Sequence, residues 1–219
     1  MDTHIIHQKY SPMKSDPFFP YVAAAIIAGT LVAFANTARA SDETQVTRKG
    51  TWTNAAGGTG TASATTTRSN GSASTQGTWT NAAGGTGNWQ SQRTWNSQTK
   101  TGTVSGTATR PNGSTATWQG TAAKTAPGAF SDKGTITLSN GKTYTYSGTD
   151  TREAPGTWDR QGTITTPSGA AINRNVVTSV SGGTGTRTAT TTLPSGQATT
   201  RTQTFTQTSV AVAQSTPNP

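Results

Sequence analysis

Short segments of alternating residues, separated by glycine-containing turn signals, run through most of this chain. Taking Gln98 as a degenerate turn, the signals recur in steps of 13–15 residues. The segments between them alternate with a period of two, which is typical of half-buried strands joined by hairpins. The turn glycines are Gly58, Gly71, Gly85, Gly113, Gly128, Gly141, Gly156, Gly169, Gly183 and Gly196. The spacing predicts an all-β, up-and-down antiparallel meander of about twelve short strands, forming either an elongated sheet or a barrel.

Internal repeats support a regular architecture. The eleven residues GTWTNAAGGTG occur twice, at 50–60 and 77–87. Longer copies of 22 residues begin at 50, 120, 148 and 175, and each contains two turn signals whose glycines are 13 residues apart. A disordered low-complexity tract has no reason to keep such a step, although few apolar residues and excess charge are otherwise typical of disorder.

The turn residues specify the loop type. Pro111, Pro167 and Pro194 stand at the first central position of their turns. Proline fixes φ near −65°, which excludes type I′ and II′ turns there and favours a three-residue loop ending in a left-handed glycine. Ser69-Asn70-Gly71 and Ser139-Asn140-Gly141 fit the same loop.

Loop length fixes which side chains share a face. With the loop 139–141, Ile136 faces Tyr144 and Thr137 faces Thr143. With the loop 167–169, Ile164 meets Ile172, and with the loop 111–113 Thr107 and Thr109 join Thr115 and Thr117 on one face. Each hairpin is therefore predicted to have a threonine face and a sparse apolar face, and hence a thin core.

The N-terminal region has the layout of a secretory signal. Lys9 and Lys14 precede an uncharged apolar run at 21–35, and Ala38-Arg39-Ala40 follows as a small-x-small cleavage site. We expect an N-terminal signal-peptide helix within 1–40, cleaved after Ala40, with translation starting at Met1 or Met13. Residues 41–49 are expected to be a flexible segment, 50–212 the repeat domain and 213–219 a flexible tail. The apolar run is short for a membrane span, so no integral span is expected after cleavage.

Composition excludes most catalytic chemistry. From residue 41 onward the chain has 47 Thr and 24 Gly but no His, Cys or Met. A histidine base for nucleophilic catalysis, a His- or Cys-based metal site and a disulfide are therefore all absent from that stretch. We expect no enzyme activity, no catalytic residues, no cofactor and no metal.

The charge balance suggests anionic partners. The formal net charge is +9 for the whole chain, and the basic residues are spread out without a run, which argues against specific nucleic-acid recognition. The six tryptophans could be sugar-stacking platforms or core residues. The candidate binding residues are Trp52, Trp79, Trp89, Trp95, Trp118, Trp158, Arg110, Arg187 and Arg201.

Two functions are compatible with these features. The first is an exported, non-enzymatic, structural or adhesive protein of the cell surface or extracellular matrix, whose threonine-rich edge strands pair with copies of itself. The alternative is a secreted or periplasmic module that binds carbohydrate or another polyanion through exposed Trp and Arg. Ice binding by threonine ranks is a remote third, because twisted hairpins are not flat. An outer-membrane barrel matches the strand length, but too few large apolar residues are present to face lipid.

A resemblance supports the envelope setting. The rhythm G-T-x-T followed by P-N-G-x-T-x-T across residues 50–205 resembles Thr/Gly-rich repeat proteins of bacterial envelopes. The signature of tyrosine–aspartate repeat shells is absent. The resemblance implies no particular activity.

Overall fold

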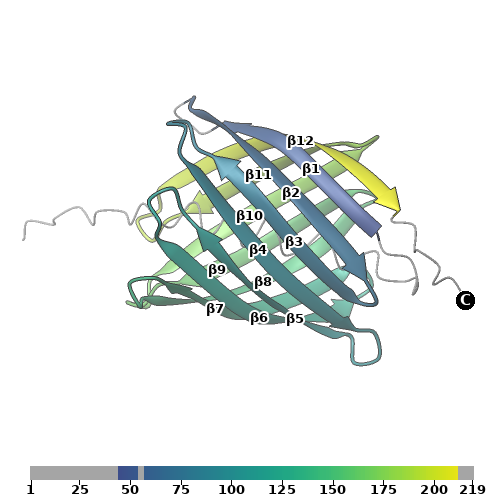
Figure 1. The fold of residues 1–219 in the computed structure, drawn as a ribbon. Helices are drawn as coiled ribbons and strands as arrows, with labels where there is room; N and C mark the ends of the chain where they lie inside the picture. Colours follow the sequence, from purple (N-terminus) through teal and green to yellow (C-terminus); the bar gives the residue numbers. More distant parts are fainter. Residues whose placement is uncertain (1–43, 54–56, 212–219) are drawn as a thin grey trace, which may run out of the picture.

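Twelve antiparallel strands close into a barrel in the computed structural model, which describes residues 44–53 and 57–211 (Figure 1). Each strand pairs with its sequence neighbours, and β1 pairs with β12 to close the wall. The predicted meander is confirmed, and the wall is a closed barrel rather than an elongated sheet. The strands are β1 (Thr44–Thr53), β2 (Thr59–Ser69), β3 (Ser72–Thr80), β4 (Thr86–Asn96), β5 (Thr101–Thr109), β6 (Thr115–Ala126), β7 (Ala129–Leu138), β8 (Thr143–Ala154), β9 (Thr157–Thr165), β10 (Ala171–Ser181), β11 (Thr184–Thr192) and β12 (Ala198–Ala211).

The boundaries of the domain differ from expectation at one end. Residues 44–49 were expected to be flexible, but they form the first half of β1 and pair with both β2 and β12. The expected signal peptide with Ala38 and Ala40, and the tail at 213–219, lie outside the described residues. Within the described part, no helix is long and apolar enough to cross a membrane.

The register predicted from the turns is confirmed. Ile136 pairs with Tyr144 and Thr137 with Thr143 across β7 and β8. The loop 139–141 closes with Leu138 N–H donating to the Lys142 carbonyl (2.9 Å), and Gly141 has the expected left-handed φ of 80°. Ile164 likewise pairs with Ile172, and Thr107 with Thr117. The three-residue loops at 111–113, 139–141 and 167–169 therefore determined correctly which side chains share a face.

Three turns differ from the predicted form. Ser69 pairs with Ser72, so Asn70-Gly71 is a two-residue loop with φ of 46° and 75°, a type I′ turn, because asparagine tolerates the left-handed region. In the two AGG turns the left-handed residues are Gly57 and Gly84, one position before the predicted Gly58 and Gly85.

The turn without glycine is a four-residue loop. Asn96 pairs with Thr101, and the Asn96 side-chain oxygen accepts hydrogen bonds from the N–H groups of Gln98 (2.9 Å) and Thr99 (3.1 Å). Lys100 holds the left-handed position with φ 57°. The predicted mark at Gln98 therefore lies inside a real turn whose geometry Asn96 stabilises.

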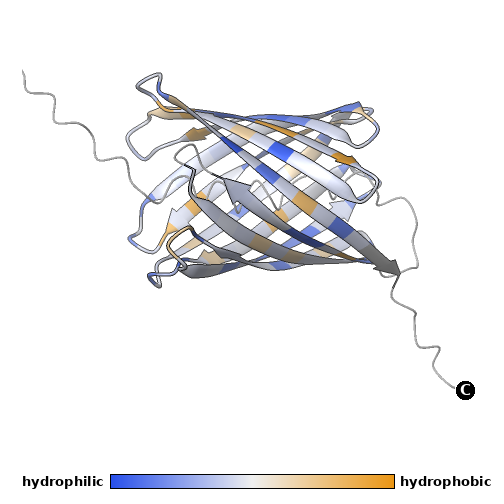
Figure 2. Ribbon diagram, turned by 90° about the horizontal axis from the view of Figure 1, so that it is seen from above, coloured by the Kyte–Doolittle hydropathy of each residue, from blue (hydrophilic) through white to orange (hydrophobic). Residues whose placement is uncertain are grey.

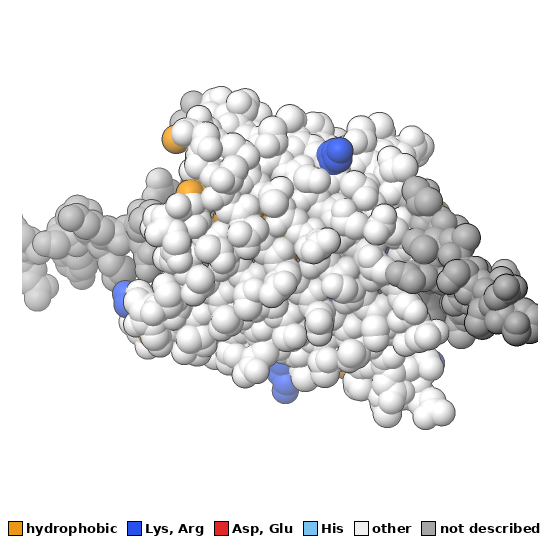
Figure 3. Space-filling model, viewed as in Figure 1, with side chains coloured by type: hydrophobic (Ala, Val, Ile, Leu, Met, Phe, Trp, Pro, Cys, Tyr) orange, Lys and Arg blue, Asp and Glu red, His pale blue; other side chains and the backbone are white. Residues whose placement is uncertain are grey.

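The outer face of the barrel is polar and dominated by threonine. Figure 3 shows one side of the molecule covered almost entirely by side chains that are neither charged nor hydrophobic. Val177, at 43% exposure, is the one large hydrophobic side chain exposed in the described part. On β11 and β12 the outward positions are Thr184, Thr186, Thr188, Thr190 and Thr192, and Thr200, Thr202, Thr204, Thr206 and Thr208.

Hydrophobic positions are scattered singly along the strands of the barrel (Figure 2). Apolar side chains point inward, where aromatic rings cover glycines on the neighbouring strand. A Cβ added at any of these glycines would lie only 2.2–2.6 Å from a ring atom, so each ring packs flat against the wall. The pairs are Trp52 on Gly60, Trp79 on Gly87, Trp89 on Gly77, Trp118 on Gly106, Tyr146 on Gly134 and Phe205 on Gly185. This pairing explains how a chain with so few large apolar residues builds a core.

Candidate functional site

Seven arginines point into the space enclosed by the barrel wall, which we call the lumen. Each lies at the same parity along its strand as buried neighbours. Arg174, for example, stands between Ile172 and Val176, which are both buried. The inward arginines are Arg48 on β1, Arg68 on β2, Arg93 on β4, Arg160 on β9, Arg174 on β10, Arg187 on β11 and Arg201 on β12. The strand pattern therefore places positive charge on the inner side of the wall.

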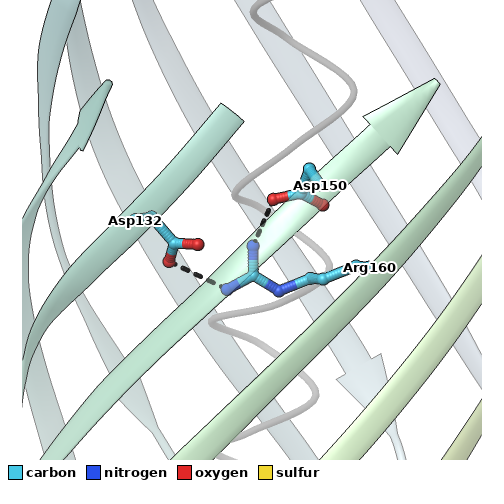
Figure 4. Close-up of polar contacts among 3 residues, drawn as sticks. All are labelled: Asp132, Asp150 and Arg160. Carbon is cyan, nitrogen blue, oxygen red and sulfur yellow. Dashed lines mark hydrogen bonds and ion pairs between the residues drawn. The ribbon is translucent and has the colours of Figure 1, made fainter. Parts of the chain in front are cut away.

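Arg160 has two acidic partners. Its Nη1 donates to Asp150 Oδ2 (2.7 Å) and its Nη2 to Asp132 Oδ2 (2.8 Å), with all three side chains almost fully buried (Figure 4). These side chains come from the adjacent strands β7, β8 and β9. One arginine therefore uses both inward aspartates.

Two further arginines have uncharged partners. Arg48 Nε donates to Gln207 Oε1 (2.8 Å) across the β1–β12 closure. The Arg201 guanidinium stacks 3.9 Å from the ring centroid of Trp52, a cation–π contact. These contacts orient the two guanidinium groups.

Several buried guanidinium nitrogens have no hydrogen-bond partner among the described residues. They include Nε and Nη2 of Arg93, Nε of Arg174 and Nη2 of Arg187. A buried charge without a partner is costly, and an arginine cannot relieve the cost by losing its proton near neutral pH. These nitrogens are therefore buried hydrogen-bond donors without an acceptor in the described part of the chain.

Burial and repulsion between neighbouring arginines both lower the pKa of Arg93 and Arg187. Burial, followed by the charges of Arg68, Arg48 and Arg160, lowers the pKa of Arg93 to about 9. Burial, followed by the charges of Arg174, Arg201 and Arg160, lowers the pKa of Arg187 to about 9. The arginines remain protonated at neutral pH and repel one another, so an anion among them would relieve that repulsion.

Asp150 has a strongly shifted pKa. Burial raises its pKa to about 7, the charge of Arg160 opposes that rise, and Asp132 adds to it. The net charge of the Asp132–Arg160–Asp150 group consequently changes near neutral pH.

The predicted tryptophans lie inside the barrel. Trp52, Trp89, Trp118 and Trp158 are buried, and Trp79 and Trp95 are half-buried. Of the two roles considered for the tryptophans, core packing fits the structure and exposed sugar-stacking platforms do not. The rings cover cross-strand glycines or pack together, as Trp95 does against Phe130 at 5.8 Å between centroids.

Of the three predicted arginines, two reach the lumen. Arg187 and Arg201 point inward, whereas Arg110 lies at the turn between β5 and β6. The arginines that sequence reasoning missed are Arg48, Arg68, Arg93, Arg160 and Arg174. Strand parity was the signal that could have found them, because each alternates with residues of the apolar face.

The edges expected to support self-association are not free. β1 and β12 pair with each other over Thr44–Thr53, so every described strand has two neighbours. The premise of unprotected edge strands is therefore wrong, because closure uses both edges.

Comparisons with known proteins identify the fold. No protein-family model and no curated protein matches the sequence. Among solved structures, the KdgM porin has a TM-score of 0.57 at 7% identity, covering 74% of this chain and 97% of the porin. The KdgM porin in complex with disordered oligogalacturonate has a TM-score of 0.56 at 7% identity with the same coverage. A mutant of the Rh. blastica porin has a TM-score of 0.44 at 8% identity, covering 77% of this chain and 99% of that one. At these identities, the KdgM porin comparison establishes a shared barrel fold.

Proposed function

We propose that this protein is an exported, non-enzymatic barrel that binds an anionic ligand in its lumen. The observation that carries the proposal is the trio Arg93, Arg174 and Arg187, whose buried guanidinium nitrogens have no hydrogen-bond partner in the described part of the chain. The two inward aspartates of that part are both bound to Arg160. Carboxylate, sulfate and phosphate groups are the chemistry that guanidinium groups recognise with charge-assisted hydrogen bonds.

The outer face favours a barrel surrounded by water. A barrel embedded in a membrane presents an apolar band to lipid, flanked by aromatic girdles. Here the aromatic rings point inward and the outward positions of β11 and β12 are threonines. We infer a periplasmic, cell-surface or secreted location for the mature protein, where an acidic surface polymer or lipid could supply the anion.

A structural or adhesive role is less well supported than ligand binding. It depended on edge-to-edge pairing, and the β1–β12 ladder occupies both edges. Ice binding is disfavoured further, because the threonine ranks lie on a curved barrel wall rather than on a flat surface. The KdgM porin has been solved with oligogalacturonate, an acidic oligosaccharide, which makes oligogalacturonate a reasonable first probe.

Calorimetry on purified protein tests the proposal. Trigalacturonate and inorganic pyrophosphate are the anionic probes, and maltotriose is the neutral control. We expect at least one anion to bind, with affinity falling as salt increases. Arg93→Gln and Arg187→Gln should each weaken that binding, while Lys133→Gln, which removes an equal charge from the exposed outer face, should not. Failure of both anions to bind at low salt would refute the proposal.

A further inference from the structure

The lumen has two chemically different sides. Strands β5–β8 contribute an apolar wall, and strands β11, β12, β1 and β2 lie opposite in the closed order of the barrel (Figure 1). The inward apolar residues on β5–β8 are Val104, Ala108, Ala116, Trp118, Ala122, Phe130, Ile136, Leu138, Tyr144 and Tyr146, all buried. The inward residues on the opposite side include one arginine per strand, at Arg187, Arg201, Arg48 and Arg68.

The charged side chains also differ between the two sides of the lumen. The two inward aspartates on β7 and β8 both form ion pairs with Arg160. Lys124 and Arg152 have the inward parity on β6 and β8, but both are exposed at the ends of their strands. Arg174 and Arg93 extend the basic side at its two margins, on β10 and β4. The side from β10 through the closure to β4 is therefore the basic wall.

The side opposite the apolar wall is mixed, because Val46, Trp52, Ala189 and Phe205 point inward there beside the arginines. The buried members of both apolar clusters of the described residues lie on β4–β9. Eight strands enclose an interior that side chains just fill, and the diameter grows with strand number. Twelve strands thus hold an apolar wall and a basic wall apart, with the rings folded flat onto glycines such as Gly106 and Gly134.

We propose that the lumen ligand is an anionic amphiphile, whose charged group lies on the basic wall and whose single alkyl chain, or an apolar part of similar size, lies on the apolar wall. This inference rests on the proposed function and narrows its ligand class. Charge complementarity assigns the head group, because Arg93, Arg174 and Arg187 have buried guanidinium nitrogens without partners among the described residues. A purely hydrophilic anion would satisfy those arginines but would leave the β5–β8 wall facing polar groups.

A chain-length series tests the inference on the unmodified protein. Butyl, hexyl, octyl and decyl sulfate are titrated well below their micellar concentrations, with circular dichroism confirming that the barrel stays folded. We expect saturable binding whose affinity rises with every added methylene, up to roughly fourfold each. Decanol, which has the chain without the charge, should bind at least tenfold more weakly than decyl sulfate.

Two variants separate the contributions of the walls. Arg187→Gln should weaken decyl sulfate binding at least tenfold and leave decanol binding unchanged. Lys133→Gln on the outer face is the matched charge control and should change neither affinity. If Arg187→Gln fails to fold, the chain-length series still decides the question, because it uses the unmodified protein.

The outcomes distinguish this inference from the proposed function. Equal affinity for butyl and decyl sulfate, together with binding of trigalacturonate or pyrophosphate, overturns the amphiphile and leaves the anion-binding lumen intact. Decanol binding as tightly as decyl sulfate also overturns it, because the basic wall would then contribute nothing. If neither the alkyl sulfates nor the two small anions bind, both proposals are wrong.

Discussion

The packing of aromatic rings on cross-strand glycines gives the sharpest prediction about stability. At Gly87, the three nearest atoms to an added Cβ all belong to the Trp79 ring, at 2.2, 2.5 and 2.6 Å. Ordinary van der Waals contact lies at about 3.5–4.0 Å, so the ring must move by more than 1 Å or leave its position. We therefore expect Gly87→Ala to lower the free energy of unfolding by about 1–3 kcal/mol, the usual range for overpacking.

A double-mutant cycle isolates the ring from other causes. Trp79→Ala alone removes a half-buried ring and should cost about 3 kcal/mol or somewhat less. With the ring gone, Gly87→Ala should cost nothing and could even stabilise by about 0.4–1 kcal/mol through the unfolded chain. The expected coupling energy between the two sites is therefore at least about 1 kcal/mol.

Urea unfolding followed by circular dichroism measures all four variants. Gly162→Ala is the matched control, because its φ is ordinary and the nearest atom to an added Cβ, the Ser147 carbonyl oxygen, is 3.3 Å away. That control should change stability by less than Gly87→Ala does. If Gly87→Ala costs as much in the Trp79→Ala background as in the natural sequence, ring-on-glycine packing is not what constrains this position.

Three further predictions follow from local geometry. The pKa of Asp150 rises from 3.8 to about 7 on folding, so between these pH values the folded state binds a proton that the unfolded state has lost. Stability should therefore fall as pH rises through that interval, and the urea midpoint should be lower at pH 7.5 than at pH 4.5. Asp150→Asn should reduce this difference. Gly156→Ala should lower the melting temperature more than Gly169→Ala, since both glycines have positive φ but only at Gly156 would a Cβ meet backbone, the Val180 oxygen at 2.2 Å; equal losses would mean that φ alone decides. Lys100→Gly should raise the melting temperature, because Lys100 holds a left-handed φ of 57° that glycine adopts freely; a lower melting temperature would contradict this.

Local features of the sequence predicted local features of the barrel. Proline at the first central turn position restricted the loop type, and the resulting register put Ile164 opposite Ile172. The same loop, extended to Ser139-Asn140-Gly141, put Ile136 opposite Tyr144. The threonine face also followed from that register. Where a turn has no proline, as at Asn70-Gly71, the same composition admits a two-residue loop, and the sequence pattern could not choose between them.

Closure of the barrel depends on a contact between the ends of the chain. β1 and β12 meet across a separation that no turn motif encodes, so strand count alone left a sheet and a barrel open. Residues 44–49 precede the first repeat and fall within the 41–49 segment that was expected to be flexible. Their alternation, with Val46 and Arg48 on the inward side, becomes informative only once β12 supplies a partner.

The arginines were missed for a different reason. Arginine is rarely fully buried unless it is paired, so spread-out basic residues are normally assigned to the solvent-facing side of a strand. Counting parity outward from the confirmed turns would have placed Arg174 beside Ile172 and Val176 on the apolar face. The usual exposure of arginine therefore misleads at Arg174, where the strand register alone indicates an inward side chain.

The contrast between Arg160 and Arg93 indicates why the basic wall exists. Arg160 has a structural explanation, because two aspartates on adjacent strands bind both of its terminal nitrogens. Arg93 has buried Nε and Nη2 atoms without partners in the described part of the chain, and its nearest charges include Arg68 and Arg48, which repel it. Such an arrangement lowers stability unless something else supplies the negative charge, and proteins depart from the rule of paired buried charges chiefly at functional sites. The wall strands could accept a neutral side chain at these positions without losing any backbone hydrogen bond. Arg93, unlike Arg160, therefore has no structural explanation among the described residues, and this supports the proposed anion-binding lumen.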